Sequence, residues 1–532
     1  MAKRARKNDK SSSYRSNKST GNREDTRGNS KSRGDMDSRN GMNDVSWYTK
    51  YPSLSIASAQ FPFPNRPGME VTLRAGAPKL QYQIPGVMAL EWYPSVGWSE
   101  NATDPASIVC KELFSKVRKA YGAGDLLADG PDFLIYLMAL DGVFSYIASL
   151  RRIYRVLTAW TPDNYVLPDQ VLFALGVNSS TLTELRMHRT QLWQCINELT
   201  LMSRKFTCPA VMDIMNRHFW MNDNVYTDAA SINSQLYVFY QRGFFQYAEQ
   251  NMPSGDPAAG LSIVDNPLTR NSGTATTVET LFTFGRGLID ALVAWDDAYT
   301  INGYLSRAFE GIPNFIVDET PLDQPFNPVY EPEVLMQIEN SRALWAGILN
   351  KESLNVSQDV LTNSIISKPT LKLWTPEADT NTTNVGTCGL QYLNAYLSQR
   401  TDSPTVADNI VASRLHSNVM PIPGDTANAR IVSATEIPLQ WSIWIGNNSM
   451  TSVPQVFGVP QVNLKNPNFL YHLLSMDAFD WHPLSQLYVY LDLSDVSRFE
   501  YSRIVGDVHN FTTISVEDLM NMHKICVYSE FN

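Results

Sequence analysis

The feature that most restricts how this chain can fold is one long apolar run. Residues 133–150 read FLIYLMALDGVFSYIASL and lie between Asp132 and Arg151. The run reaches the minimum length of a bilayer span. Asp141 stands in its middle, however, where a carboxylate costs at least ~2.5 kcal/mol to insert. A helix buried in a sizeable protein core is therefore favoured over a membrane span.

Capping residues delimit helices around this run. Asp104 is a suitable N-cap, Pro105 fits the first helical position, and Gly122 predicts the end of that helix. The apolar run itself predicts a helix over 130–160. The second half of this helix should finish near a surface because it carries Arg151, Arg152 and Arg155. Other helices are predicted over 181–204 from the capping box Thr181-Leu-Thr-Glu184, over 278–309, over 333–349 and over 516–523.

The other regular segments are extended or ambiguous. Residues 46–100 are rich in proline and aromatic side chains, which suits a clasp or short strands more than a helix. Residues 233–247 fit either a strand pair that turns at Arg242-Gly243 or a helix. Near the C-terminus, LQWSIWIG, LYVYLDL and ICVYSEF are predicted as strands.

The length of the chain and the alternation of helical and loop-rich stretches predict more than one domain. A chain of 532 residues with 43% hydrophobic side chains can bury sizeable cores but is too long for one of them. We expect a mainly α fold with some β. Its parts would be an arm over 1–45, a helical domain over 46–250, a loop-rich and exposed domain over 251–440, and a C-terminal return to the helical domain over 441–532.

Charge divides the chain at about residue 45. The net charge is -10, but residues 1–45 carry twelve Lys or Arg against six Asp or Glu, so they contribute +6 and the rest -16. All of the positive excess lies in the first eighteen residues. These 45 residues have too little apolar surface to offset the entropy of ordering, so we expect a disordered basic arm.

The sequence contains no short motif typical of an enzyme. P-loop, G-x-G-x-x-G, G-x-S-x-G, H-E-x-x-H and EF-hand patterns are absent, so we predict no catalytic residue, metal or cofactor. Asp477, Asp480 and His482 approach a metal cluster, but three such residues in one loop arise easily by chance. His218 is expected to be hydrogen-bonded beside packed aromatics. The five cysteines, without a C-x-x-C pair, suit a reducing compartment.

The basic arm is the feature whose physics indicates a partner. The candidate nucleic-acid-binding residues are Lys3, Arg4, Arg6, Lys7, Lys10, Arg15 and Lys18. Each cation that pairs with a phosphate releases counterions, so such binding is salt-sensitive and independent of sequence. A solvating tail or a targeting patch explains a single copy equally well. Many copies that face one interior would favour RNA, because the assembly multiplies the charge.

Several segments of the helical half resemble picobirnavirus capsid proteins. They are IPGVMALEWYPSVGWS (84–99), PDFLIYLMALDGVFSYIASLRRIYRVLTAW (131–160), DNYVLPDQVLFALGVN (163–178), MDIMNRHFWMNDNVY (212–226) and YVFYQRGFFQY (237–247). The resemblance covers most of residues 80–250 by motif, and beyond 250 it rests on length, order and texture. These motifs are structural, so they indicate a family without naming a site.

The resemblance implies a helical shell domain that carries a protruding domain, with dimers that build an icosahedral particle around double-stranded RNA. It implies a virion protein that is assembled in the host cell cytoplasm. Its partners would be itself and, through the arm, viral RNA, and contact with a host membrane during infection stays open. In some members the N-terminal segment is removed by self-cleavage. No motif here matches a cleavage residue, and Asn40-Gly41 and Asn65-Arg66 are only chemically suitable positions.

Two other classes of function stay open on the sequence alone. A non-assembling RNA-binding protein, such as a nucleocapsid or replication accessory protein, would form salt-dependent filaments or beads on RNA. An enzyme with an aromatic cleft would require a carboxylate or histidine cluster in a deep pocket. The leading hypothesis, a capsid subunit, predicts closed particles that protect their RNA from RNase.

Overall fold

The computed structural model describes residues 45–59, 66–72, 75–76, 81–122, 125–159, 166–230, 233–269, 274–344, 347–373, 395–445, 449–453, 456–460, 474–490, 499–505 and 511–531. Contacts divide the chain into two units, Met1–Pro64 and Asn65–Asn532. Of the predicted basic arm, only Val45 is among the described residues.

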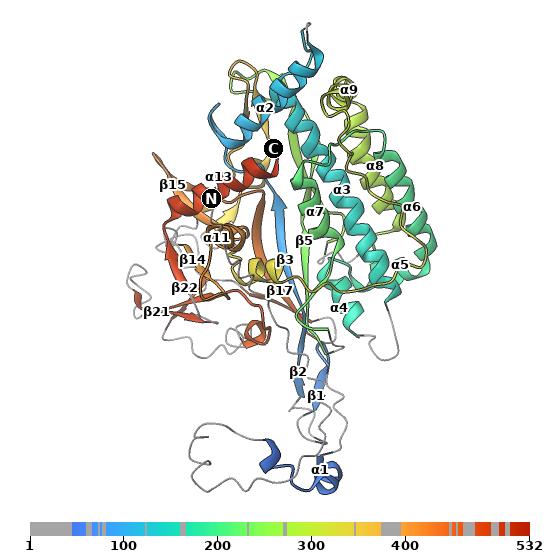
Figure 1. Cartoon of the computed structure of the whole chain (residues 1–532), viewed down its shortest axis with the longest axis vertical. Coiled ribbons are helices and arrows are strands. Elements are labelled where there is room, and N and C mark those ends of the chain that lie inside the picture. The colour runs from blue at the N-terminus through green and yellow to red at the C-terminus, as the bar shows by residue number, and fades with distance from the viewer. Residues whose placement is uncertain are drawn as a thin grey trace, which may run out of the picture. The chain divides into compact units, whose positions relative to one another are not determined.

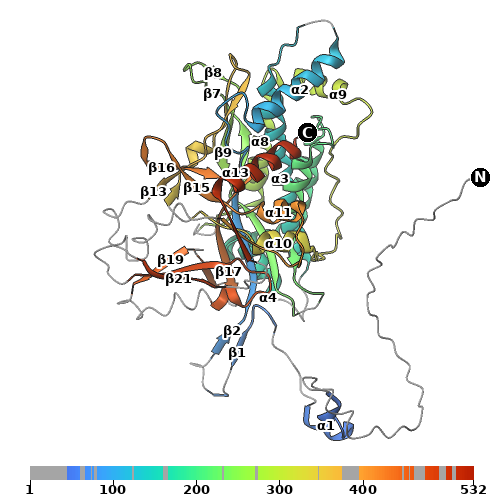
Figure 2. The same cartoon turned by 60° about the vertical axis from the view of Figure 1, so that its left-hand side comes forward.

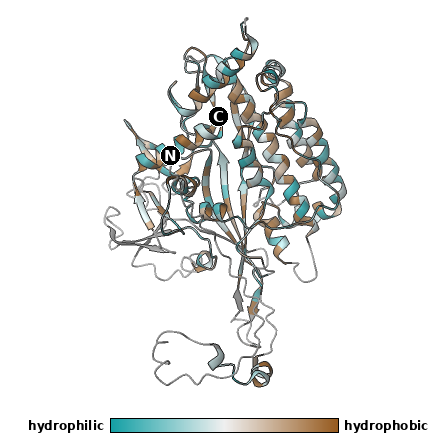
Figure 3. Cartoon of the chain, in the orientation of Figure 1, coloured by the Kyte–Doolittle hydropathy of each residue, from teal (hydrophilic) through white to brown (hydrophobic). Residues whose placement is uncertain are grey.

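The first unit presents an apolar segment to its surface. It contains the 3-10 helix η3 (Val45–Trp47) and the helix α1 (Pro52–Ala59), and no residue of α1 is buried. Leu54 and Ile56 are 66% and 61% exposed, and Trp47 and Tyr51 are exposed as well. Figure 3 shows apolar positions, in brown, on the ribbon of α1.

The second unit is organised around a five-stranded sheet in the order β18-β17-β3-β5-β4. The strands are β3 (Pro85–Pro94), β4 (Tyr226–Thr227), β5 (Leu236–Gln241), β17 (Glu436–Ile445) and β18 (Ser449–Val453). The central strand β3 runs antiparallel to β17 and parallel to β5. Its side chains alternate between two cores, with Val87 and Ala89 in one and Met88 and Leu90 in the other. Because both faces of β3 are covered, the strand is apolar almost throughout.

A helical layer covers one side of this sheet, with α3 (Gly130–Thr158) at its centre (Figure 1). Around α3 pack α2 (Pro105–Tyr121), α4 (Val166–Ala174), α6 (Arg189–Ser203), α7 (Asp213–Asp223), α8 (Val278–Val293) and α9 (Ala298–Ala308). The most apolar 18-residue window of α3 has the length and hydropathy of a membrane span but is 100% buried inside the protein. The prediction of a buried core helix is therefore confirmed.

Gly142 explains how closely α3 approaches the neighbouring strand β6 (Gly243–Tyr247). A Cβ atom at Gly142 would lie 2.2 Å from the carbonyl oxygen of Phe245, which is a backbone atom and cannot rotate away. Only glycine allows this contact. The apolar run therefore contains a glycine for a packing reason, directly beside Asp141.

The C-terminal segment returns to the helical layer. The helix α13 (Val516–Glu530) packs against α2, α7 and α11 (Val406–Ser413), as Figures 1 and 2 both show for α11. A four-stranded sheet beside it has the order β10 (Gly347–Leu349), β13 (Thr370–Leu373), β16 (Asp425–Val432), β15 (Asn418–Ile422). The division into domains at residues 250 and 440 stays a prediction.

The other elements are short. They are α5 (Ser179–Met187), α10 (Pro332–Glu339), η5 (Lys351–Leu354), β1 (Glu70–Thr72), β2 (Gln81–Gln83), β7 (Gln250–Asn251), β8 (Pro257–Ala258), β9 (Leu261–Asp265), β11 (Ser357–Asp359), β12 (Ser364–Ile366), β14 (Ala395–Ser398), β19 (Val456–Pro460), β20 (Ser485–Tyr490), β21 (Phe499–Val505) and β22 (Phe511–Ile514). The longest elements are helices and most strands are short, which confirms a mainly α fold with some β.

Several predicted boundaries are wrong. Asn178, not Thr181, caps the helix at 179, because its side chain accepts the backbone N–H of Thr181 at 2.8 Å. The predicted helix over 181–204 is two helices, α5 and α6, which meet at His188. The helix over 278–309 is likewise interrupted between α8 and α9.

Three segments near strand and helix limits also differ. The predicted helix over 333–349 ends at Glu339, and its last residues form β10. ICVYSEF is not a strand, because Leu519, His523 and Val527 repeat at helical spacing and bury one face of α13. The segment 233–247 forms two strands, but β5 pairs with β3 and β4, whereas β6 pairs with β9.

Candidate functional site

A network of buried charged side chains joins the helical layer to the C-terminal segment. Its centre is Glu436 at the start of β17, whose side chain has no exposed surface. Arg217 on α7 donates to Glu436 Oε1, and Arg414, directly after α11, donates to Oε2 at 3.2 Å. Glu530, the last residue of α13, accepts from Arg414 and lies 3.6 Å from Nε of Arg217. The network therefore connects elements that are far apart in the sequence.

His218, the neighbour of Arg217 on α7, extends the network to α3. Its Nδ1 lies 2.6 Å from Oδ2 of Asp141, and its Nε2 lies 3.5 Å from Oε1 of Glu436. The imidazole also packs against Trp92, with 5.0 Å between the ring centroids. The prediction that His218 is hydrogen-bonded beside packed aromatics is confirmed.

The neighbours of each group decide its charge. Burial alone would lower the pKa of His218, but Asp141 and Glu436 raise it to about 9. Burial would raise the pKa of Glu436, but Arg217 and Arg414 hold it well below its ordinary range. Burial raises the pKa of Asp141, and His218 opposes that effect. With His218 protonated, the buried cations and carboxylates balance one another.

This geometry supports ion pairing and gives no access for a reaction. His218 and Asp141 have the pairing of a general base and its orienting carboxylate, but their side chains are 0% and 1% exposed. The second ring nitrogen of His218 faces Glu436, so both nitrogens are turned toward carboxylates. The network therefore has a structural role, and removal of one member would leave a buried charge without its partner.

The arginines at the end of α3 form a second buried group. Arg152 is 2% exposed and donates to the carbonyl of Met221 at 2.9 Å, at the end of α7. Arg155 pairs with Asp223 at 2.7 Å, and Arg151 lies 3.7 Å from the same carboxylate. The prediction that α3 finishes near a surface holds for its last turn, because Arg155, Leu157 and Thr158 are partly exposed, whereas Arg151 and Arg152 are buried. The guanidinium groups of Arg152 and Arg155 donate to backbone carbonyls at the C-terminal end of α7. The sequence pattern of α3 alone does not predict these contacts.

Two other buried histidines, His416 and His523, are neutral instead of protonated. Nδ1 of His416 donates to the carbonyl of Asn340 at 2.8 Å, and Nε2 of His523 donates to the carbonyl of His416 at 2.9 Å. Burial lowers the pKa of His416 to about 3, and the cationic Arg342 adds to the effect. Burial lowers the pKa of His523 to about 4. Both rings are therefore neutral at pH 7.

The candidate nucleic-acid-binding residues of the arm lie outside the described residues, as do Asn40, Gly41 and Asn65. Asp477, Asp480 and His482, the three residues that approach a metal cluster in sequence, do not converge on one point. His482 Nε2 lies 3.5 Å from Asp477 Oδ1, whereas Asp480 offers a backbone carbonyl to Arg400. Within the described ranges, no three His, Cys, Asp or Glu residues are grouped so that they could hold a metal ion.

Sequence reasoning missed the centre of the charge network. Glu436, Arg414 and Glu530 belong to no local motif, because their partners lie on other elements. One weak signal exists: Glu436 is a single charged residue at the head of the apolar strand EIPLQWSIWI. A charge in that position needs a buried partner.

Comparison with known proteins connects this fold to a family. The model of the family described as picobirnavirus capsid protein matches residues 47–443. The chain is 23% identical over 548 residues to the capsid protein precursor of Human picobirnavirus (strain Human/Thailand/Hy005102/-), which covers 92% of this chain and 91% of that protein. Its fold is similar to an X-ray crystallographic structure of the picobirnavirus capsid. That match has a TM-score of 0.76 and 20% identity, over 92% of this chain and 98% of that chain.

Proposed function

The chain belongs to the picobirnavirus capsid protein family, so it is a structural protein of the virion, and we propose that it dimerises and closes into an icosahedral shell around double-stranded RNA. The family model covers most of the folded part of the chain, which supports this reading over a non-assembling nucleocapsid. The reading assigns no catalytic residue and no cofactor.

The apolar surface of the first unit is the observation that best supports self-association. Trp47, Tyr51, Leu54 and Ile56 are each more than half exposed within one short segment. Large apolar side chains gathered in one place are typical of a surface that another protein covers. In a capsid subunit, the natural partner is a second copy of the same chain.

The division of charge supports a role for RNA. Residues 1–45 carry +6 and the rest of the chain -16, and the positive excess lies in the first eighteen residues. Cations on a polar segment can pair with phosphates, while the acidic body limits contact with RNA elsewhere. A charge of +6 per chain neutralises only part of a genome. We therefore expect the arm to recruit or organise RNA, while the folded body drives assembly. Contact with a host membrane stays a prediction.

Deletion of residues 1–45 separates these two roles. We expect the shortened chain to form closed shells with altered RNA content, because α1 and the folded body are retained. Electron microscopy of the purified protein would show the shells, and RNase treatment followed by extraction would measure the protected RNA.

Two outcomes would contradict this proposal. Soluble monomers of the full-length chain under physiological conditions would contradict assembly itself. Complete loss of shells on deletion of residues 1–45 would contradict the division of roles. Salt-dependent filaments or beads on RNA would instead favour a non-assembling nucleocapsid.

A further inference from the structure

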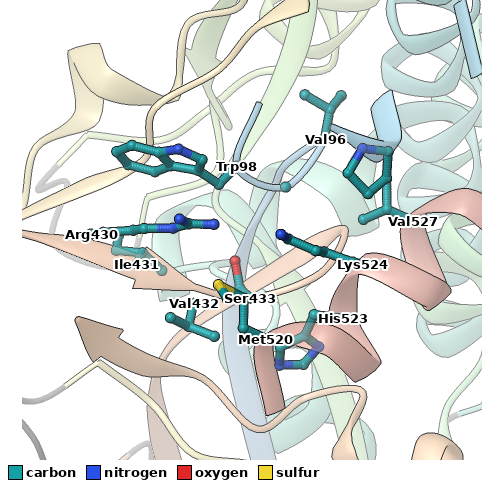
Figure 4. A pocket seen from close by; sticks show the side chains of 12 residues that line it. Val96, Trp98, Arg430, Ile431, Val432, Ser433, Met520, His523, Lys524 and Val527 are labelled. Carbon is teal, nitrogen blue, oxygen red and sulfur yellow. The ribbon is translucent and has the colours of Figure 1, made fainter. Parts of the chain in front are cut away.

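A small surface pocket lies where the loop after β3 meets the end of β16 and the helix α13 (Figure 4). Trp98 comes from the loop, Arg430 from β16, Ser433 from the residue beyond Val432, and Lys524 from α13. Apolar side chains and His523 complete the lining. No Asp or Glu is among the residues that line this pocket.

The cationic side chains converge inside the pocket. Figure 4 shows the guanidinium group of Arg430 and the ammonium group of Lys524 pointing toward one another, with the Ser433 hydroxyl beside them. The guanidinium carbon lies 4.6 Å from the centre of the Trp98 ring, so the indole holds it in place. Gly97, with φ of 71°, makes the turn that brings Trp98 over the pocket.

Among the described residues, no carboxylate forms an ion pair with Arg430 or Lys524, although Asp104 and Glu100 lie near enough to favour the charged form of Arg430. Nε of Arg430 is buried and has no hydrogen-bond partner. The acidic groups that act on Arg430 are Asp104 and Glu100. Glu100 pairs with Lys368 at 2.7 Å. Asp104 accepts two backbone N–H groups through Oδ2, at 2.8 and 2.9 Å.

Other cations of the second unit have nearby acceptors. Arg414 faces the carboxylate of Glu436, and Arg152 faces the backbone carbonyl of Met221. The residues that line the pocket include no carboxylate, although residues 46–532 carry a net charge of -16.

We propose that this pocket binds a phosphate group through Arg430, Lys524 and Ser433. A tetrahedral phosphate offers several acceptor oxygens, so it can accept from the guanidinium fork, the ammonium group and the hydroxyl at once. The phosphate can belong to free inorganic phosphate or to the backbone of RNA. The inference goes beyond the proposed function, because it rests on the pocket residues and holds whether or not the chain forms shells.

Calorimetric titration of the full-length protein with inorganic phosphate, at constant ionic strength and pH 7, tests the site. Saturable binding of one phosphate per chain is expected. Lys524→Gln and Arg430→Gln should each weaken binding by about tenfold or more, because each removes a charged donor. The matched control is Lys119→Gln, which removes an exposed cation of α2 outside the pocket.

The site would be refuted by the absence of saturable phosphate binding to the wild-type protein. It would equally be refuted if Lys119→Gln weakened binding as much as Lys524→Gln did, since that result indicates a general charge effect. Circular dichroism establishes that each variant is folded. Lys524 is only partly buried, so Lys524→Gln decides the matter if Arg430→Gln does not fold.

A second arm of the experiment identifies the source of the phosphate. A short RNA duplex is added to the protein saturated with inorganic phosphate. If the duplex displaces the phosphate, and does so less well for Lys524→Gln, the site takes the RNA backbone. If phosphate stays bound while the duplex binds elsewhere, the site takes the free ion.

Discussion

The helices α3 and α1 are both apolar, but α3 is buried and α1 is exposed. The apolar window of α3 is entirely buried and packs against helices and strands of its own chain. No residue of α1 is buried, and Leu54 and Ile56 lie mostly in the open. The comparison teaches that the core of the second unit is complete within that unit, whereas the first unit leaves its apolar side chains uncovered by its own residues, in line with the proposed self-association.

The buried charges of the second unit are likewise paired within that unit. The buried cations around Glu436 face carboxylates of the same chain, and His218 is protonated for that reason. His416 lies beside Arg342 instead of a carboxylate and is neutral. Both histidines are fully buried, so the difference in their charge comes from their neighbours and not from burial alone.

The largest expected effect comes from a break at the centre of the charge network. Glu436→Gln keeps the shape of the side chain but leaves Arg217, Arg414 and His218 with too few anions. We expect the free energy of unfolding to fall by about 3–5 kcal/mol. Urea unfolding of the unassembled chain, followed by tryptophan fluorescence, measures it.

The control is Glu319→Gln, which removes an exposed carboxylate that pairs with Arg204 at the surface. Exposed ion pairs contribute about 0–1 kcal/mol, so this change should be small. If the two variants lose equal stability, the buried network does not hold the second unit together.

A smaller effect is expected from acid. The pKa values of His416 and His523 are about 3 and about 4 in the folded chain and about 6.5 when unfolded. Their stabilising contribution is thus fully present above pH 6.5 and is lost as the pH falls toward the folded values. Between pH 6.5 and pH 5 the two together should cost about 3 kcal/mol.

The variant His416→Asn with His523→Gln keeps hydrogen-bond donors but removes both titrating rings. Its free energy of unfolding should fall less between pH 6.5 and pH 5 than that of the wild-type chain. Equal slopes for the two proteins would show that other groups cause the loss in acid.

The sequence predicts much of the fold where a segment carries its own signal. Asp104 and Gly122 stand at the two ends of α2 as predicted, and the apolar run lies within α3. Prediction from the sequence fails where contacts with residues far away in the chain determine the structure. ICVYSEF is helical because α13 packs on α2 and α11, and Arg152 is buried because α7 ends beside it. Likewise, the pocket of Arg430 and Lys524 joins residues that no spacing connects.

The comparison between α1 and α3 is tested most directly by sedimentation velocity of the variant Leu54→Ser with Ile56→Ser. Because neither side chain is buried, the free energy of unfolding should change by no more than about 0.5 kcal/mol. The control Ser53→Ala alters the same helix but keeps its apolar surface. We predict that the double variant folds normally but yields far fewer particles than the wild-type chain and the control. Equal particle yields from all three proteins would contradict the claim that a second copy covers this surface.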